Sequence, residues 1–248
     1  MRQPAHRQTA SRGSGRGFLL SSCSILTHTG PRARAAGSVE RMNLNPDAVM
    51  WSAPERERAG RPLLVLLHGY ASHEGDLFQL SPRLPLGPVI ASVRAPLAEN
   101  NGWAWFSFLS RGISDPSIDE VDEATSALIA WLDGLDFTSV SLLGFSQGAV
   151  VALQALRRQP ERFRSVVALS GFVAAGDSAG DELLAEGRPP VFWGRGTLDR
   201  VIPSAAIERT ESWLPPHSTA TIRIYENLAH SLSTDELTDI AEFLRAHG

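Results

Sequence analysis

A serine at the end of an apolar run is the side chain best placed for nucleophilic chemistry. The segment Gly144-Phe-Ser146-Gln-Gly148 follows the apolar residues 140–143, and an Ala/Val/Leu-rich segment comes directly after it. This order predicts a buried strand, a sharp turn and a helix, with small residues flanking the serine because the backbone crowds the turn. Such a turn lifts the hydroxyl above the sheet and points the helix N-terminus at any negative charge that develops there. The alternative interpretation is a glycine-rich turn with an incidental serine.

A serine hydroxyl is a weak nucleophile and needs a base, usually a histidine that a carboxylate orients. Asp199 follows a predicted strand at 191–193, and His230 follows a predicted strand at 222–225. Because functional groups of a parallel sheet lie beyond the carboxyl ends of its strands, we expect Ser146, Asp199 and His230 to meet at one edge. Taken singly, Asp199 could form a turn or cap a helix, and His230 could lie on the surface. Together they predict a catalytic triad.

Acyl transfer to a serine also needs N–H donors for the oxyanion of the tetrahedral intermediate. We expect one donor to be the backbone N–H of Gln147, which follows the nucleophile. The other is expected to be the backbone N–H of Tyr70, in the loop after the apolar run at 63–67. His68 of the same loop is interpreted as a structural histidine that bonds the loops around this site.

Three aromatic side chains, Trp103, Trp105 and Phe106, follow the predicted strand at 89–93 and so fall near the same edge. We interpret them as candidates for substrate binding in an acyl pocket, with a position in the core as the alternative. The His, Glu and Asp within residues 73–76 are too loosely spaced for a metal site. The sequence therefore predicts no metal site.

Hydrophobic runs without alternation indicate strands that are buried on both faces, as in a parallel sheet covered by helices. A further run at 222–225 alternates, which suits a strand nearer the edge of the sheet. The predicted buried strands occupy residues 63–67, 89–93, 140–143, 166–169 and 191–193, with a short strand also expected within 48–54.

Helical spacing of apolar residues is found between these runs. Two of the predicted helices begin with capping-box patterns, Ser117-x-x-Glu120 and Ser233-x-x-Glu236. The alternation predicts an α/β fold: a single, mostly parallel sheet with right-handed crossovers and helices on both faces. We expect no large cap domain, because the connection at 171–190 is short. The predicted helices span residues 117–133, 149–158, 203–214 and 233–246.

Composition narrows the classes of function. The chain has 248 residues, enough for one large α/β domain, and its one cysteine cannot form an intrachain disulfide. Residues 1–41 hold seven of the 23 basic residues but only one of the 27 acidic residues. The rest of the chain is therefore acidic, which argues against a nucleic-acid partner. No apolar run approaches the roughly 20 residues that a membrane-spanning helix needs.

Residues 1–41 also differ from the rest in pattern. They are rich in Arg, Ser, Gly and Thr and show no periodicity. We interpret them as a disordered leader or a misassigned start upstream of Met42, with a degenerate export signal as the alternative. Residues 42–248 are predicted to form the catalytic domain. A cytoplasmic location is expected only by default, since the export signal is poor.

Several short motifs from about Trp51 to the end of the chain occur together in one group of enzymes. The chain resembles the α/β hydrolases of the phospholipase/carboxylesterase family, which includes acyl-protein thioesterases and small bacterial carboxylesterases. The Gly-Phe-Ser-Gln-Gly segment is fairly specific to that family. The motifs are Leu66-Leu-His-Gly-Tyr70, Arg94-Ala-Pro96, Trp105-Phe106, Gly144-Phe-Ser-Gln-Gly148, Gly196-x-x-Asp199 with Val201-Ile-Pro203, and His230-Ser231.

The resemblance implies hydrolysis of carboxylic esters or thioesters, without a cofactor. We expect short- to medium-chain esters of small molecules as substrates, and a monomer or homodimer. The resemblance also implies Ser146 as nucleophile, Asp199 as acid and His230 as base. The oxyanion donors carry over to Tyr70 and Gln147. Two other positions depart from the family pattern, which often has Gly in place of Ala71 and Asp in place of Ser107.

Two alternative functions stay open at this point. A lysophospholipase or acyl-protein thioesterase would use the same groups on long acyl chains. A non-catalytic module that binds small molecules could use the same fold. A dienelactone hydrolase fits less well, because that family has cysteine where this chain has Ser146.

Overall fold

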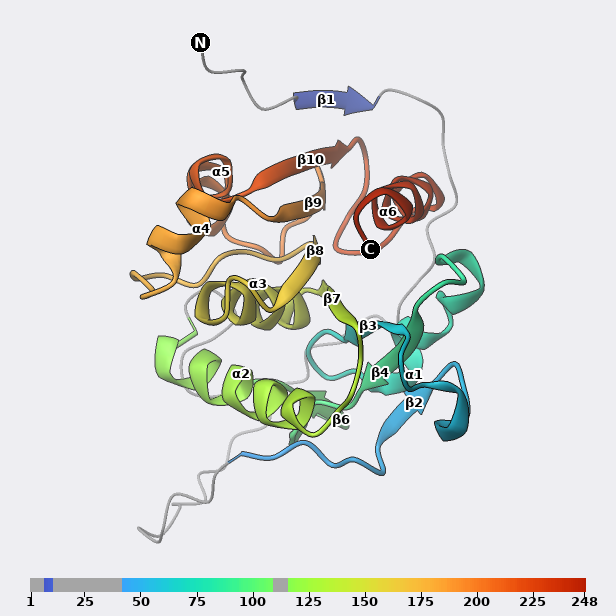
Figure 1. Cartoon of the computed structure of the whole chain (residues 1–248). Helices are drawn as coiled ribbons and strands as arrows, with labels where there is room; N and C mark the ends of the chain where they lie inside the picture. The colour runs from blue at the N-terminus through green and yellow to red at the C-terminus, as the bar shows by residue number, and fades with distance from the viewer. Residues whose placement is uncertain (1–6, 11–41, 109–115) are drawn as a thin grey trace, which may run out of the picture.

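The apolar runs form the centre of one mixed β-sheet. The computed structural model describes residues 7–10, 42–108 and 116–248. Within these residues the strands follow the order β1-β10-β9-β8-β7-β3-β4-β2 (Figure 1). Their bounds are β1 Arg7–Ala10, β2 Val49–Trp51, β3 Pro62–Leu67, β4 Val89–Val93, β7 Ser139–Phe145, β8 Phe163–Leu169, β9 Pro190–Gly196 and β10 Thr219–Tyr225.

Neighbouring strands of this sheet are parallel except β2 and β4, which pair antiparallel. All five residues of β4 are buried, as are the last five of β3. A parallel strand with helices on both sides has no face toward water, so its sequence has no need to alternate. This explains the unbroken apolar runs.

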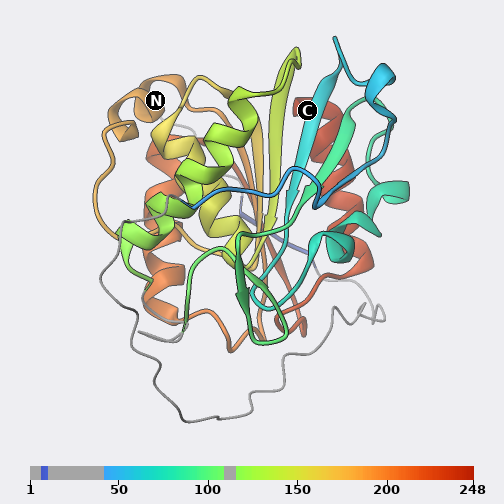
Figure 2. The ribbon, with the colours of Figure 1, turned by 90° about the horizontal axis from the view of Figure 1, so that it is seen from below.

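Helices cover both faces of the sheet, as the view along it in Figure 2 shows. Alternate residues of β3 belong to two separate apolar clusters. Leu63, Val65 and Leu67 pack on the side of α2, α3 and α5, whereas Leu64 and Leu66 pack on the side of α1 and α6. The helix bounds are α1 Glu74–Phe78, α2 Ile118–Asp133, α3 Gln147–Arg158, α4 Asp181–Gly187, α5 Ser204–His217 and α6 Thr234–His247.

The predicted fold class is confirmed. The sheet is mostly parallel, helices lie on both faces, and the order of strands is that of an open sheet rather than a barrel. The connection at 171–190, all of which the structure describes, carries the seven-residue helix α4 and no larger unit. The edge of the sheet beyond the strand ends is therefore free of a cap built from this connection.

A second, two-stranded sheet was not predicted. It is a hairpin of β5 Leu97–Glu99 and β6 Gly102–Ala104, which pair antiparallel. Its two-residue turn is Asn100-Asn101, with φ of 51° and 59°. Positive φ at both central residues is what a type I′ turn requires, and asparagine tolerates it. The asparagine pair is the sequence signal that predicts this hairpin.

The end of helix α5 differs from prediction. Helix α5 was expected to end at residue 214, but it continues through Pro215 and Pro216 to His217. Side chains support this last turn: the His217 ring stacks on Trp213, and Ser218 Oγ donates to the Leu214 carbonyl at 2.7 Å. The prolines have no N–H to donate to the carbonyl four residues back, so these side-chain contacts supply part of the support that the last turn lacks.

The two predicted capping boxes have different outcomes. Ser117 makes no side-chain capping bond to α2, so that prediction is wrong. Ser233 does cap α6, since its Oγ accepts from the backbone N–H of Glu236 at 3.1 Å. The carboxylate of Glu236, however, does not complete the reciprocal bond.

Of the segment interpreted as a leader, the structure describes residues 7–10 alone. They form β1, which lies parallel to β10. The rest of residues 1–41 lies outside the described residues, so its interpretation as a leader stays a prediction. Among the helices that the structure describes, none combines the length and hydrophobicity needed to cross a membrane.

Candidate active site

Ser146 lies in the turn between β7 and α3, with φ 54° and ψ −116°. Positive φ is uncommon for any residue with a side chain and marks local strain. A Cβ on Gly148 would collide with the Leu67 carbonyl oxygen, and a Cβ on Gly144 would collide with the Gly148 carbonyl oxygen. The two glycines therefore permit a close approach of backbone to backbone. We call residues 144–148 the elbow.

Three side chains from separate strand ends meet at the elbow. His230 Nε2 lies 3.0 Å from Ser146 Oγ, and His230 Nδ1 lies 2.8 Å from Asp199 Oδ2. Ser146 and His230 are 84 residues apart in the sequence. A hydroxyl that contacts an imidazole, itself held by a carboxylate, is the geometry that lets a serine be deprotonated as it attacks. The structure brings together the three side chains that the sequence analysis selected.

Asp199 is held in place from two directions. One oxygen, Oδ2, contacts His230, while Oδ1 accepts from the backbone N–H of Val201 at 2.9 Å and of Ile202 at 3.3 Å. Burial by itself would raise the pKa of Asp199, but the hydrogen bond with His230 and the two peptide donors outweigh it. Its pKa therefore lies below the usual value, and Asp199 is a carboxylate at neutral pH.

The loop that follows β3, residues 68–72, packs against the elbow, and we call it the β3 loop. A Cβ built on Gly69 would lie 3.4 Å from Ser146 Cβ. The predicted donor residue Tyr70 comes next in this loop. Gln147, the other predicted donor residue, is the first residue of α3, where backbone N–H groups have no partner within the helix. Gln147 thus follows Ser146 directly, and Tyr70 follows Gly69, which packs against Ser146.

His68 is fully buried and bonds at both ring nitrogens. Nδ1 lies 2.7 Å from the Gly69 carbonyl oxygen, and Nε2 lies 3.0 Å from the backbone N of Ala95. The peptide N–H of Ala95 can only donate, so Nε2 accepts and Nδ1 carries the proton. Burial lowers the pKa of His68 to about 4, so the ring is neutral at physiological pH. This placement agrees with the interpretation of His68 as a structural histidine.

The side chain of Gln147 has a role that the sequence analysis missed. Its Oε1 accepts from the backbone N–H of Trp105 at 2.9 Å, and its Nε2 donates to the Phe106 carbonyl at 2.7 Å. The Trp105 indole N–H also donates to the His68 carbonyl at 2.9 Å. The segment after the β5–β6 hairpin is therefore attached to both the elbow and the β3 loop.

The aromatic residues proposed for substrate binding do not share one environment. Trp105 and Phe106 are 0% and 1% exposed and belong to the core cluster on the α2–α3 side. The structure thus places both in the core, the alternative to an acyl pocket. Trp103 is partly buried, and the Arg94 guanidinium lies 4.9 Å from its ring centroid. A role for Trp103 in substrate binding stays a prediction.

Polar groups in residues 72–76 pair with one another and with Arg94. Ser72 Oγ donates to Asp76, and Glu74 makes a two-point ion pair with Arg94. The Arg94 pair lowers the pKa of Glu74. Asp76 thus bonds Ser72, while Glu74 pairs with the arginine. In residues 42–108 and 116–248, no group of three or more His, Cys, Asp or Glu has the arrangement of a metal site.

Glu236 lies six residues after His230 and is fully buried. Neither carboxyl oxygen has a hydrogen-bond partner, and a Cβ on Gly194 would collide with Oε1. Burial raises the pKa of Glu236 to about 8, and the nearby charge of Asp239 adds to the shift. Glu236 is therefore largely protonated at neutral pH and does not act as a charged partner of His230.

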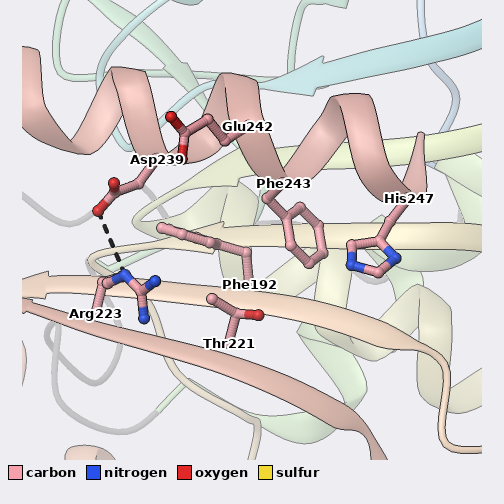
Figure 3. A pocket seen from close by; sticks show the side chains of 7 residues that line it. All are labelled: Phe192, Thr221, Arg223, Asp239, Glu242, Phe243 and His247. Atoms are coloured by element: carbon pink, nitrogen blue, oxygen red, sulfur yellow. Dashed lines mark ion pairs between the residues drawn. The ribbon is translucent and has the colours of Figure 1, made fainter. Parts of the chain in front are cut away.

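A cavity of about 140 Å³ lies between α6 and the strands β9 and β10 (Figure 3). Arg223 and Asp239 form an ion pair at its wall, 3.4 Å apart. None of Ser146, Asp199 and His230 lines it. This cavity is separate from the site described above. Its lining residues are Phe192, Thr221, Arg223, Asp239, Glu242, Phe243 and His247.

The chain is similar to a described protein family and to several known proteins. The sequence pattern of the family described as Phospholipase/Carboxylesterase matches residues 52–248. Acyl-protein thioesterase 1 of Kluyveromyces lactis is 25% identical over 213 residues, which cover 76% of this chain and 93% of that protein. Esterase PE8 has a solved structure that superimposes with a TM-score of 0.63 at 30% identity, covering 77% of this chain and 94% of its own.

A carboxylesterase of Bacillus cereus has a similar fold. Its structure superimposes with a TM-score of 0.67 and covers 80% of this chain and 93% of its own. At 22% identity, this match concerns the fold alone.

Proposed function

Since the chain belongs to the phospholipase/carboxylesterase family, whose members here are named esterases and thioesterases, we propose that it hydrolyses short- to medium-chain carboxylic esters through an acyl-enzyme on Ser146. The observation that carries this proposal is the pair of contacts at His230, 3.0 Å to Ser146 Oγ and 2.8 Å to Asp199 Oδ2. Residues 42–248 would form the catalytic unit.

The first half of the reaction makes the acyl-enzyme. His230 Nε2 takes the proton of Ser146 as Oγ attacks the acyl carbonyl, and the C–O double bond becomes an oxyanion. The backbone N–H groups of Tyr70 and Gln147 hold that oxyanion. His230 then gives its proton to the leaving alcohol as the ester bond breaks.

The second half releases the acid. Water takes the place of the alcohol, gives a proton to His230 and attacks the acyl carbon, and Ser146 leaves with that proton. Asp199 keeps its charge throughout, orients the imidazole and stabilises its cation. Its lowered pKa supports this role, because Asp199 is then ionised in the folded enzyme near neutral pH.

The connection between β8 and β9 carries α4 and no larger covering unit, so we expect an open site without a cover to enclose a long acyl chain. The test is a panel of p-nitrophenyl esters from acetyl to palmitoyl, beside the matching thioesters. We expect the largest kcat/KM for the short esters. Ser146→Ala is expected to lower kcat by about 10⁴-fold or more. A Ser146→Ala variant with most of the wild-type activity would rule out the acyl-enzyme.

A second candidate is a lysophospholipase or acyl-protein thioesterase with a preference for long acyl chains. The specific observation in its favour is the relative named acyl-protein thioesterase 1, which matches over most of both chains. The same panel separates the two, because this candidate predicts a maximum at long acyl chains and turnover of thioesters.

A further inference from the structure

The β5–β6 hairpin contacts the β3 loop in three places. The Tyr70 hydroxyl donates to Glu99 Oε1 at 2.8 Å. The backbone N–H of Trp103 donates to the Ser72 carbonyl at 2.8 Å, as part of a β-bridge between these two residues. Between them, Gly102 approaches the backbone of Ala71 so closely that a Cβ would collide with the Ala71 carbonyl oxygen. The hairpin is thus held against the full length of residues 70–72.

The β3 loop needs such support because one of its residues is strained. Ala71 has φ 56°, in the left-handed region. That conformation is unfavourable for a residue with a Cβ. Strained residues persist where the surrounding structure holds them from several sides. Tyr70 is the residue directly before Ala71, so any relaxation of Ala71 would shift the chain next to Tyr70.

Glu99 is the side chain that ties Tyr70 to the rest of the hairpin segment. The same oxygen that accepts from Tyr70 also accepts from the backbone N–H of Phe108 at 3.2 Å. The rings of Tyr70 and Phe108 lie 4.7 Å apart. One carboxylate therefore joins the side chain of Tyr70 to a backbone segment that Gln147 already fixes at Trp105 and Phe106.

We propose that Glu99 is a positioning residue for the reaction: by holding the Tyr70 side chain, it sets the direction of the Tyr70 backbone N–H toward the oxyanion. This inference rests on the proposed function. Both residues that carry the predicted oxyanion donors would then be held by the same chain segment. Glu99 of that segment holds Tyr70, and its residues 105 and 106 are bound by Gln147. Glu99 itself does not touch the reacting atoms.

The chain supplies a matched control, because it has two tyrosines and each donates to a carboxylate at 2.8 Å. Tyr70 donates to Glu99, and Tyr225 donates to Asp239 of α6. Tyr70→Phe and Tyr225→Phe each delete one such hydrogen bond. A loss of stability alone would affect both variants, whereas a positioning role affects catalysis only in the first.

The experiment measures kcat, KM and thermal midpoint for wild type, Glu99→Leu, Glu99→Gln, Tyr70→Phe and Tyr225→Phe on p-nitrophenyl butyrate. Active enzyme is counted by titration with a fluorophosphonate. Misplacement of a catalytic group by about 1 Å costs up to about 100-fold. We therefore expect Glu99→Leu and Tyr70→Phe each to lower kcat by about 10- to 100-fold, with KM changed less than about threefold.

Three further results are expected. Glu99→Gln should keep most of the activity, because an amide oxygen can accept from both Tyr70 and Phe108. The double variant Glu99→Leu/Tyr70→Phe should be no slower than the slower single variant, since both changes remove the same hydrogen bond. Affinity for an alkylboronic acid, which forms a tetrahedral adduct on the serine, should fall in parallel with kcat.

Different outcomes overturn different statements. A wild type that is active and labelled, with a Glu99→Leu variant within about threefold of it in kcat, overturns the role of Glu99 alone. Equal losses of kcat and thermal midpoint in Tyr70→Phe and Tyr225→Phe also overturn it. A wild type with neither turnover nor a fluorophosphonate adduct overturns the proposed function and, with it, the role of Glu99.

Discussion

Two turns face each other at the candidate active site, and they are held in different ways. The elbow follows β7 and the β3 loop follows β3, and each contains one non-glycine residue with positive φ, Ser146 at 54° and Ala71 at 56°. The elbow is held by backbone: Gly148 packs directly on the Leu67 carbonyl. The β3 loop is held by several side chains, among them His68 and Tyr70, and by the backbone of the β5–β6 hairpin.

This difference implies different tolerances. The Leu67 carbonyl belongs to a central strand and cannot move aside. An atom added at Gly148 should therefore displace the elbow. A loop held by several side chains should lose its geometry in steps, as each contact is removed. The predictions below test that contrast, from the largest effect to the smallest.

Gly148→Ala should have the largest effect. Its Cβ would collide with the Leu67 carbonyl oxygen, so the elbow must shift relative to β3. Because misplacement by about 1 Å costs about 100-fold, we expect kcat to fall at least that far. Gly87→Ala is the matched control, since no atom lies within 4 Å of a Cβ at that exposed position. Circular dichroism establishes that both variants are folded, and equal kcat in the two would contradict the account of the elbow.

Gly102→Ala should have a smaller effect of the same kind. The added Cβ would collide with the Ala71 carbonyl, but the β5–β6 hairpin is a two-stranded unit outside the main sheet and can shift outward. We expect a loss of about tenfold in kcat, less than for Gly148→Ala. Ester kinetics on the two variants side by side give the ratio. A larger loss for Gly102→Ala would reverse the proposed order of rigidity.

Acid should loosen the β3 loop through His68. Its pKa is about 4 in the folded protein, against about 6.5 when unfolded, so the unfolded state binds the proton first. Stability from this group is complete above about pH 6.5 and is lost as pH falls toward 4, by on the order of 3 kcal/mol. Urea unfolding of wild type and His68→Gln between pH 7.5 and 4.5 measures it. The wild type should show the steeper decline, and parallel curves would contradict the assignment.

Ala71→Gly should give the smallest change, and in the opposite direction. Glycine adopts φ 56° without strain, but it also gains entropy in the unfolded state. We expect a net gain of up to about 1 kcal/mol in the free energy of unfolding. The control Ala98→Gly, at an exposed position in β5, should instead lower it by about 0.5–1 kcal/mol. The same sign of change in both variants would argue against strain at Ala71.

The same contrast explains how much could be predicted from the sequence. The apolar runs and the small residues around Ser146 predicted the sheet and the elbow, because steric limits on the backbone restrict which residues fit. The positions of Asp199 and His230 followed from the rule that parallel strands end at one edge. Each of these inferences depends on local pattern or on chain order.

The contacts of the β3 loop could not be predicted in this way. Glu99 and Tyr70 are 29 residues apart, and Gln147 and Trp105 are 42 apart. No periodicity relates them, since each contact depends on where a hairpin docks. Trp105 and Phe106 show the same limit: their types suit either a pocket or the core, and only packing decides. The sequence pattern predicts Glu236 to be an ordinary capping residue, and only the structure shows that it is buried.

The most direct test of the central claim is intact-mass analysis after treatment with a fluorophosphonate, followed by peptide mapping. The account predicts a single adduct on the peptide that contains Ser146, with esterase activity lost in proportion to labelling. Ser146→Ala should remain unlabelled. An unlabelled wild type, an adduct on another residue, or full labelling with activity retained would contradict a serine nucleophile at the elbow.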